Sequence, residues 1–222
     1  EVAHTIERVV RRAGLPYAVT QGFSPHMRVA FSAALPVGTY SESEWYDLVL
    51  TEYVPAPEAL DRLVAATPAG LVPLEAAYVD IRAKALTAHL TRAVYRIDLA
   101  SVDGVPVQAS DIEDALSRIR ERGSIEYMRG KKTKRLDVAR TLKLFSVEHL
   151  ASGAFQIMLD THQDNDGSMR PEILLSALDA MLAARYLPDA ELPVLETGIA
   201  SFLCFAVVAI VRVEQSSDDE HA

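Results

Sequence analysis

The order in which helical and strand-like patterns alternate limits the fold of this chain more than any other feature. Apolar residues at helical spacing extend from Val2 to Ala13, and a second helical stripe covers residues 57–66. A short strand is expected over residues 17–20. Further alternating or apolar runs typical of strands cover residues 28–34, 45–50 and 71–79. Apart from the short stretch 17–20, the first part of the chain therefore shows the order α, β, β, α, β.

The second part of the chain shows a similar order. We expect strands over residues 89–99, 125–128, 142–147, 154–159 and 199–213. One helix follows a capping box at Ser110-Asp111-Ile112-Glu113, and another covers residues 171–184. The sequence therefore predicts an α+β protein of two tandem ferredoxin-like βαββαβ units with antiparallel sheets, over residues 1–85 and 86–215. Residues 216–222 are polar and acidic, which predicts a disordered tail.

The first strand of unit one is missing from this pattern. A βαββαβ unit begins with a strand, whereas the chain begins with the helical stripe. The strand is either supplied from elsewhere, with the long closing strand over residues 199–213 as one donor, or lies upstream of Glu1. We expect the upstream alternative, because the sequence begins inside a helix without a cap.

Composition excludes several classes of site. Cys204 is the one cysteine, so an intrachain disulfide and a cysteine zinc cage are impossible, and its apolar neighbours favour a buried structural thiol. The histidines lack metal-ligand spacing, and no Walker, Rossmann or nucleophile motif occurs, so we predict neither metal nor cofactor. The longest apolar run, residues 199–211, is too short to cross a bilayer. With no visible signal peptide, the sequence predicts a cytoplasmic protein.

Basic residues gather in one segment of an acidic chain. The net charge is −9, yet ten basic and only three acidic residues lie between Arg118 and Lys143. The densest part holds Arg129, Lys131, Lys132, Lys134 and Arg135. These side chains could contact nucleic-acid phosphates, meet an acidic protein surface, or form a solvated hairpin tip. Tyr127 beside them could stack on a base.

The most distinctive loop is Gln21-Gly22-Phe23-Ser24-Pro25-His26-Met27-Arg28. Gly22 permits a positive φ, and Pro25 drives Ser24 into extended geometry. A fixed loop with these polar groups could bind an anion, with Arg28 as a phosphate contact and His26 as a general acid or base. In the alternative, Phe23 and Pro25 pack against the protein and the loop is a structural turn.

These two segments resemble a known bacterial family, the radical-SAM-linked proteins, a domain of unknown function found beside or fused to a radical-SAM enzyme. The matching stretches are Glu7 to Pro16, Gln21 to His26, Ala34 to Gly38 and Ser41 to Glu44. Weaker matches are the basic loop through Val138 and the Arg170-Pro171 helix start. Met27 departs from the family, which commonly has Pro there. The resemblance implies a cytosolic module that serves a radical-SAM enzyme, and it does not imply catalysis by this chain.

The sequence thus leaves three functional hypotheses open. The first is an accessory RNA-binding or substrate-presenting module for a radical-SAM enzyme, with the basic segment on phosphates and with His26 and Arg28 as a second contact. The second is a small RNA-processing enzyme that uses His26. The third is a scaffold whose acidic body and basic loop meet a partner protein. One cysteine cannot hold a four-iron cluster, so the chain lacks the radical-SAM cofactor site itself.

Overall fold

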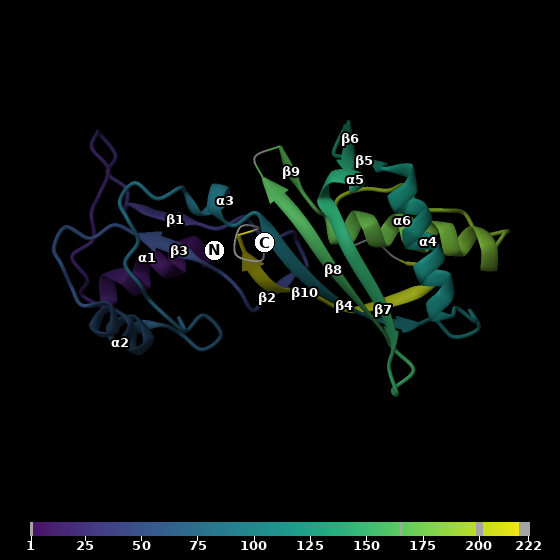
Figure 1. Cartoon of the computed structure of the whole chain (residues 1–222), viewed down its shortest axis with the longest axis horizontal. Helices are drawn as coiled ribbons and strands as arrows, with labels where there is room; N and C mark the ends of the chain where they lie inside the picture. The colour runs from purple at the N-terminus through teal and green to yellow at the C-terminus, as the bar shows by residue number, and fades with distance from the viewer. Residues whose placement is uncertain (1, 165, 199–201, 218–222) are drawn as a thin grey trace. The chain divides into compact units, whose positions relative to one another are not determined.

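The computed structural model describes residues 2–164, 166–198 and 202–217. The helices are α1 (Val2–Arg12), α2 (Ala56–Ala66), α3 (Leu86–His89), α4 (Ala109–Arg122), α5 (Val138–Thr141) and α6 (Pro171–Tyr186). The strands are β1 (Val29–Phe31), β2 (Tyr40–Ser41), β3 (Tyr46–Leu48), β4 (Arg92–Ser101), β5 (Ser124–Arg129), β6 (Lys132–Asp137), β7 (Leu142–His149), β8 (Phe155–Asp164), β9 (Gly167–Ser168) and β10 (Phe205–Ser216). The chain is therefore a mixed α and β protein, as the sequence predicts (Figure 1).

The chain divides into two compact units. Unit 1 comprises residues 1–33 and 45–86, and unit 2 comprises residues 34–44 and 87–222. The segment 34–44 leaves unit 1 between β1 and β3 and supplies strand β2 to unit 2. Sequence patterning could not show this exchange, because strand pairing between distant segments leaves no local signal.

Unit 1 is built from two helices and a two-stranded sheet. β1 pairs with β3 in antiparallel register, with Ala30 opposite Asp47. The apolar stripe of α1 packs on α2 and on the adjoining loops. The buried residues of this core are Ile6, Val9, Val10, Leu15, Met27, Val54, Ala59 and Leu63. Both helices predicted for this part of the chain are confirmed.

Two predicted strands of unit 1 do not form. Residues 71–79 form no strand or helix, and exposed apolar side chains such as Leu74 and Val79 lie along them. Residues 17–20 make only isolated bridges, from Tyr17 to Leu50 and from Val19 to Met27. A strand requires a partner for its backbone groups as well as a suitable pattern. The described residues provide no such partner for residues 71–79.

Unit 2 contains a sheet in the order β2-β10-β4-β8-β7, with β9 paired to β8. The pairings are antiparallel except that of β2 with β10, which is parallel. Burial along β8 alternates residue by residue, so one face of the strand points inward. Helices α4 and α6 cover that face (Figure 1). The predicted hairpin through Ser152-Gly153 and the helix from Pro171 are confirmed.

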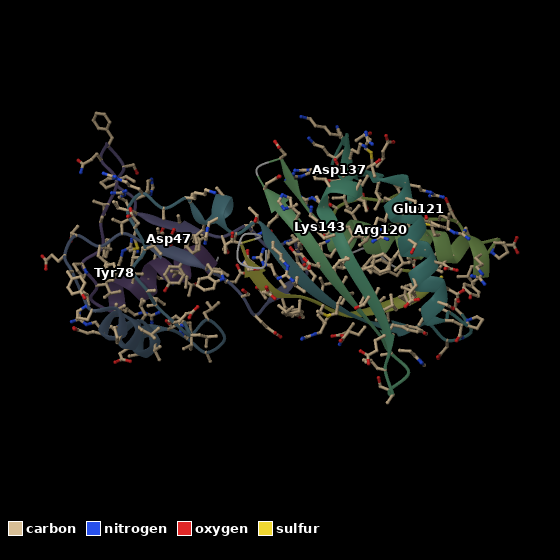
Figure 2. The ribbon with its side chains drawn as sticks, in the orientation of Figure 1. Asp47, Tyr78, Arg120, Glu121, Asp137 and Lys143 are labelled. Atoms are coloured by element: carbon tan, nitrogen blue, oxygen red, sulfur yellow. The ribbon has the colours of Figure 1, made fainter. Side chains whose placement is uncertain are left out.

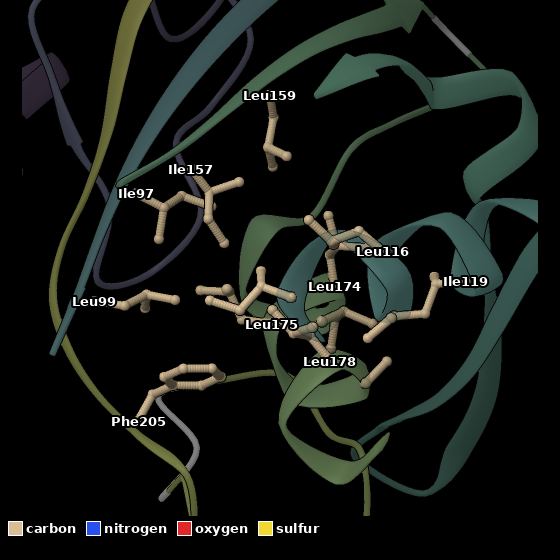
Figure 3. Packing of buried hydrophobic residues seen from close by; sticks show 14 of the residues in the cluster. Ile97, Leu99, Leu116, Ile119, Ile157, Leu159, Leu174, Leu175, Leu178 and Phe205 are labelled. Carbon is tan, nitrogen blue, oxygen red and sulfur yellow. The ribbon is translucent and has the colours of Figure 1, made fainter. Parts of the chain in front are cut away.

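The core of unit 2 lies between the sheet and these two helices. Ile97, Leu99 and Ile157 from the sheet face Leu116 on α4 and Leu174 on α6 (Figure 3). Each is at most 1% exposed. Burying one such side chain contributes about 1.5–3 kcal/mol, so the sheet and both helices stabilise one another.

Several boundaries in unit 2 differ from the sequence prediction, and His89, predicted to begin a strand, lies in α3. Helix α4 begins at Ala109, and its first turn is capped by Asp111, whose Oδ2 accepts the Gln108 N–H at 2.8 Å. Ser110, predicted as the cap, lies inside the helix. Strand β10 begins at Phe205 and ends at Ser216, so Ser216, the first residue of the predicted tail, belongs to the sheet. The start of the predicted closing strand, residues 199–201, and the remaining tail, residues 218–222, lie outside the described residues.

One fully buried arginine joins segment 34–44 to the sheet. Arg212 on β10 lies opposite Tyr95 of β4 and donates its Nε and Nη2 to Glu44 Oε1, at 3.2 and 2.5 Å. Beside it, Ser43 Oγ accepts the Gln215 N–H at 3.0 Å. These contacts fix β2 at the edge of the sheet.

No helix in the described part of the chain combines the length and the apolar character needed to cross a membrane.

Candidate nucleic-acid interface

The basic segment forms a β-hairpin rather than a loop. β5 and β6 pair from Ser124 opposite Asp137 to Arg129 opposite Lys132. Gly130 and Lys131 make the two-residue turn, and Gly130 has φ +61°, as the first central position of a type II′ turn requires. The predicted strand ahead of the basic residues is therefore confirmed, and a second strand carries most of the charges.

The root of the hairpin is fixed in the core of unit 2. Ile125, Tyr127 and Leu136 are buried in the main apolar cluster. At the outer edge of β5, Met128 donates its N–H to the Leu195 carbonyl at 2.7 Å and accepts from Thr197 N–H at 3.1 Å. The turn and the basic residues lie beyond these anchors. The hairpin is thus a rigid support for its charged end.

The charged end presents its cations to solvent. Arg129, Lys131, Lys132, Lys134 and Arg135 are all exposed. Paired residues of an antiparallel ladder share a face, so the Arg129 and Lys132 pair lies on the same face as the Tyr127 and Lys134 pair. Arg135 lies opposite Glu126 on the other face. Three of the five cations therefore gather on one face.

These cations are not neutralised by neighbouring acids. Within the described ranges, no carboxylate lies at ion-pair distance from any of the five side chains. Arg129 and Lys132 even lie directly opposite each other, an arrangement that destabilises a hairpin by a few tenths of a kcal/mol to about 1 kcal/mol. The end of the hairpin therefore carries five exposed cations without an ion-pair partner among the described residues.

Two other basic residues of the segment, Arg120 and Arg140, contact groups within the protein. Figure 2 labels four charged residues of this segment, Arg120 and Glu121 on α4, Asp137 on β6 and Lys143 on β7. The Arg120 guanidinium lies 5.3 Å from the centroid of the Phe145 ring. Arg140 binds Asp164 through both carboxylate oxygens. Tyr127 is buried, so the predicted base-stacking role for this residue is wrong.

The second candidate site, the loop from Gln21 to Arg28, belongs to unit 1. Thr20 N–H donates to the His26 carbonyl at 2.8 Å, and His26 N–H donates to Thr20 Oγ1 at 3.0 Å. Gly22 adopts the predicted positive φ, +135°. Hydrogen bonds between Thr20 and His26 therefore close the base of the loop.

The tip of this loop is exposed, contrary to the packed alternative. Phe23 is fully exposed, and Ser24, Pro25, His26 and Arg28 are exposed as well. Ser24 Oγ lies 3.5 Å from His26 Nε2, the outer limit of a hydrogen bond. The structure brings Ser24 and His26 together at this distance. His26 and Arg28 lie in unit 1 and the hairpin in unit 2.

Comparison with known proteins identifies a family of bacterial proteins, and the sequence also led us to expect a bacterial family. No curated protein matches the chain. A family model described as "Uncharacterized protein conserved in bacteria (DUF2344)" matches residues 1–171, which include the exposed loop and the whole basic hairpin. The chain therefore belongs to the DUF2344 family of proteins conserved in bacteria.

Proposed function

We propose that the chain is an accessory RNA-binding module and that the β5–β6 hairpin is its phosphate contact. The observation that carries this proposal is the like-charged pair of Arg129 and Lys132, exposed at the end of a hairpin with a buried root. No carboxylate of the described residues lies at ion-pair distance from either side chain. Bound phosphates would remove the repulsion between these cations. The net charge of −9 restricts the contact to this local surface.

Salt dependence tests this proposal directly. If five cations meet five phosphates of a single strand, the affinity changes with a log–log slope of about −3.5. Anisotropy of a labelled single-stranded RNA should then report about 100-fold weaker binding at roughly 200 mM salt than at roughly 50 mM. Absence of binding at the lower salt concentration would rule out the RNA-binding function.

The proposal extends to the fold of unit 2. We propose that β4, α4, β7, β8, α6 and β10 form a ferredoxin-like βαββαβ unit, with the β5–β6 hairpin as an insertion. The sheet order β10-β4-β8-β7 and its antiparallel pairings support this assignment. In unit 1, the order α1, β1, β3, α2 matches the central part of the same plan. A solved structure that places unit 2 in another topology would overturn it.

The resemblance to radical-SAM-linked proteins supplies a candidate partner. We propose that the exposed loop Gln21–Arg28 docks this module on a radical-SAM enzyme, with Phe23 as the anchor. An aromatic side chain that is fully exposed on a closed loop is typical of an interface hot spot. Phe23→Ser should weaken a pull-down of the enzyme at least tenfold, whereas Leu74→Ser, which changes another exposed apolar residue of unit 1, should not. Equal recovery with both variants would exclude the loop as the dock.

An enzyme that uses His26 has less support. Its imidazole is exposed, and its Nε2 lies 3.5 Å from Ser24 Oγ. In general acid or base catalysis, the imidazole is fixed in one orientation, commonly by a hydrogen bond to a further side chain. His26→Ala should therefore leave RNA binding unchanged. Cleavage of RNA by the purified chain that disappears in this variant would instead establish the enzyme.

A further inference from the structure

Helix α1 carries its arginines on the side opposite to its core. Ile6, Val9 and Val10 face the apolar cluster of unit 1 and are buried. Thr5, Arg8 and Arg12 follow at helical spacing on the other side, so their side chains lie one above another, and Arg11 lies beside them. The three arginines are exposed. The amphipathic pattern thus produces a basic ridge as well as a buried stripe.

This ridge lines a hollow. A solvent-open depression of about 520 Å³ is bounded by Thr5, Arg8, Arg11, Arg12 and Pro68, the last of which follows the end of α2. All of these residues belong to unit 1. The side chains of three arginines line this one depression, although the Arg11 guanidinium also lies 6.0 Å from the centroid of the Tyr17 ring. Each guanidinium carries several donors that match phosphate oxygens.

The acids of unit 1 leave most of this charge unpaired. Glu7 Oε2 lies 3.8 Å from Arg11 and also 3.8 Å from His4. In the described part of the chain, no carboxylate lies at ion-pair distance from Arg8 or Arg12. The hollow therefore has about two uncompensated positive charges.

Helix stabilisation does not account for all three arginines. Cations in the last turn offset a partial charge of about −0.5 at a helix C-terminus, and Arg11 and Arg12 lie in that turn of α1. Arg8 lies one turn earlier, where this effect has largely faded. The end of α2 is already capped, because Thr67 Oγ1 donates to the Leu63 carbonyl at 2.6 Å. A charge surplus remains that an anion would satisfy.

We propose that this hollow binds a phosphate monoester, with Arg8 and Arg12 as its principal ligands and Arg11 as a third. A guanidinium fork matches two oxygens of a phosphate, and the dianion compensates the two unpaired charges. The site lies in unit 1, whereas the proposed RNA contact lies on the hairpin of unit 2. The phosphate could belong to a small molecule or to the 5′ end of an RNA.

The test is calorimetric titration of the full chain with pyrophosphate, glycerol 3-phosphate, and a dinucleotide with and without a 5′-phosphate. The double variant Arg8→Gln/Arg12→Gln should bind each phosphorylated ligand at least tenfold more weakly. Two controls should keep the affinity of the natural sequence. They are Arg62→Gln, whose arginine pairs with Glu58 on α2, and a hairpin variant with Arg129, Lys132 and Lys134 changed to Gln.

The outcomes separate this site from the hairpin. Binding of the small phosphates supports a small-molecule site, and binding of the 5′-phosphorylated dinucleotide alone supports an RNA end. Loss of binding in the hairpin variant, or full binding in the Arg8 and Arg12 variant, would overturn the assignment. So would the failure of all phosphorylated ligands to bind. The RNA-binding proposal would remain unaffected by these results, because its own test uses the salt dependence of the hairpin.

Discussion

Arg140 on α5 donates to both carboxylate oxygens of Asp164 on β8, at 2.6 and 2.7 Å. Asp164 also accepts from the backbone N–H groups of Asp166 and Gly167, at 2.9 and 3.1 Å. Since α5 follows directly after β6, with Asp137 accepting the Arg140 N–H at 3.0 Å, this pair ties the root of the basic hairpin to the central sheet. Arg140 thereby acts as structural support for the hairpin.

The first prediction concerns acid stability. The hydrogen bond from Arg140 lowers the pKa of Asp164 from 3.8 to about 2. A carboxyl group whose pKa is lower in the folded state stabilises the fold above its unfolded pKa, and this contribution disappears as the pH falls from about 4 to about 2. The Asp164 side chain is 32% exposed, so solvent screening reduces the effect to about 1 kcal/mol.

Urea unfolding at pH 5 and at pH 2.5 measures this contribution. The natural chain should lose about 1 kcal/mol more than Asp164→Asn between these pH values. Asp103→Asn, which changes an exposed acid, should behave as the natural chain does. Identical losses in all three proteins would contradict the role assigned to the Arg140 and Asp164 pair.

The second prediction concerns the buried arginine. Arg212 is 0% exposed and its side chain fills the space between Tyr95 and segment 34–44, so Arg212→Ala should cost about 3–5 kcal/mol in free energy of unfolding. Arg212→Met should cost clearly less, because it keeps the volume and Glu44, 47% exposed, can be hydrated. Urea unfolding of both variants measures the two losses in free energy of unfolding. Equal costs would mean that packing around Arg212 contributes little.

The third prediction concerns the charges of the hairpin. Changing Arg129, Lys132 and Lys134 to Gln should reduce the magnitude of the salt slope for RNA by about 2, because about three phosphate contacts are lost. A matched variant changes three exposed cations elsewhere, Arg82, Lys84 and Arg118, and should keep the slope. Anisotropy over a salt series provides the measurement. Equal slopes for the two variants would point to non-specific attraction by total charge.

The fourth prediction concerns the one thiol. Burial and the nearby Asp179 carboxylate raise the pKa of Cys204 to about 11. At pH 8 the thiol is then almost wholly protonated, and Cys204 is buried, so a disulfide reagent should not label the native chain. Labelling should become rapid once urea unfolds the protein. Rapid labelling of the native chain would show that the start of β10 opens readily.

Local patterns predicted the elements whose stability is decided by neighbouring residues. The apolar stripes of α1, α2 and α6 appear at helical spacing, and the helices begin and end within a few residues of the predicted bounds. The hairpin of β7 and β8 follows from two alternating runs joined at Ser152-Gly153. Exposure of the basic residues follows from their own chemistry, because an unpaired charge is rarely buried.

Other features of the site had no local signal. Gly130-Lys131 is flanked by cations rather than by alternating apolar residues, so a second strand over residues 132–137 was not predicted. The basic neighbours of Tyr127 suggest that it stacks on a base, whereas its position in β5 places its ring in the core. The exposure of Phe23 depends on whether any other segment covers the loop, which sequence alone does not specify.

By itself, the sequence determined where the four longer helices form, which stretches are extended, and where the charge of the hairpin is concentrated, because these depend on contacts a few residues apart. The short helices α3 and α5 had no such signal. The tertiary structure alone decided which extended stretches became strands and with which partners. Segment 34–44 pairs with β10 through β2, whereas residues 71–79 form no strand. Backbone hydrogen bonds between strands join residues far apart in the chain, so only the assembled fold can assign them.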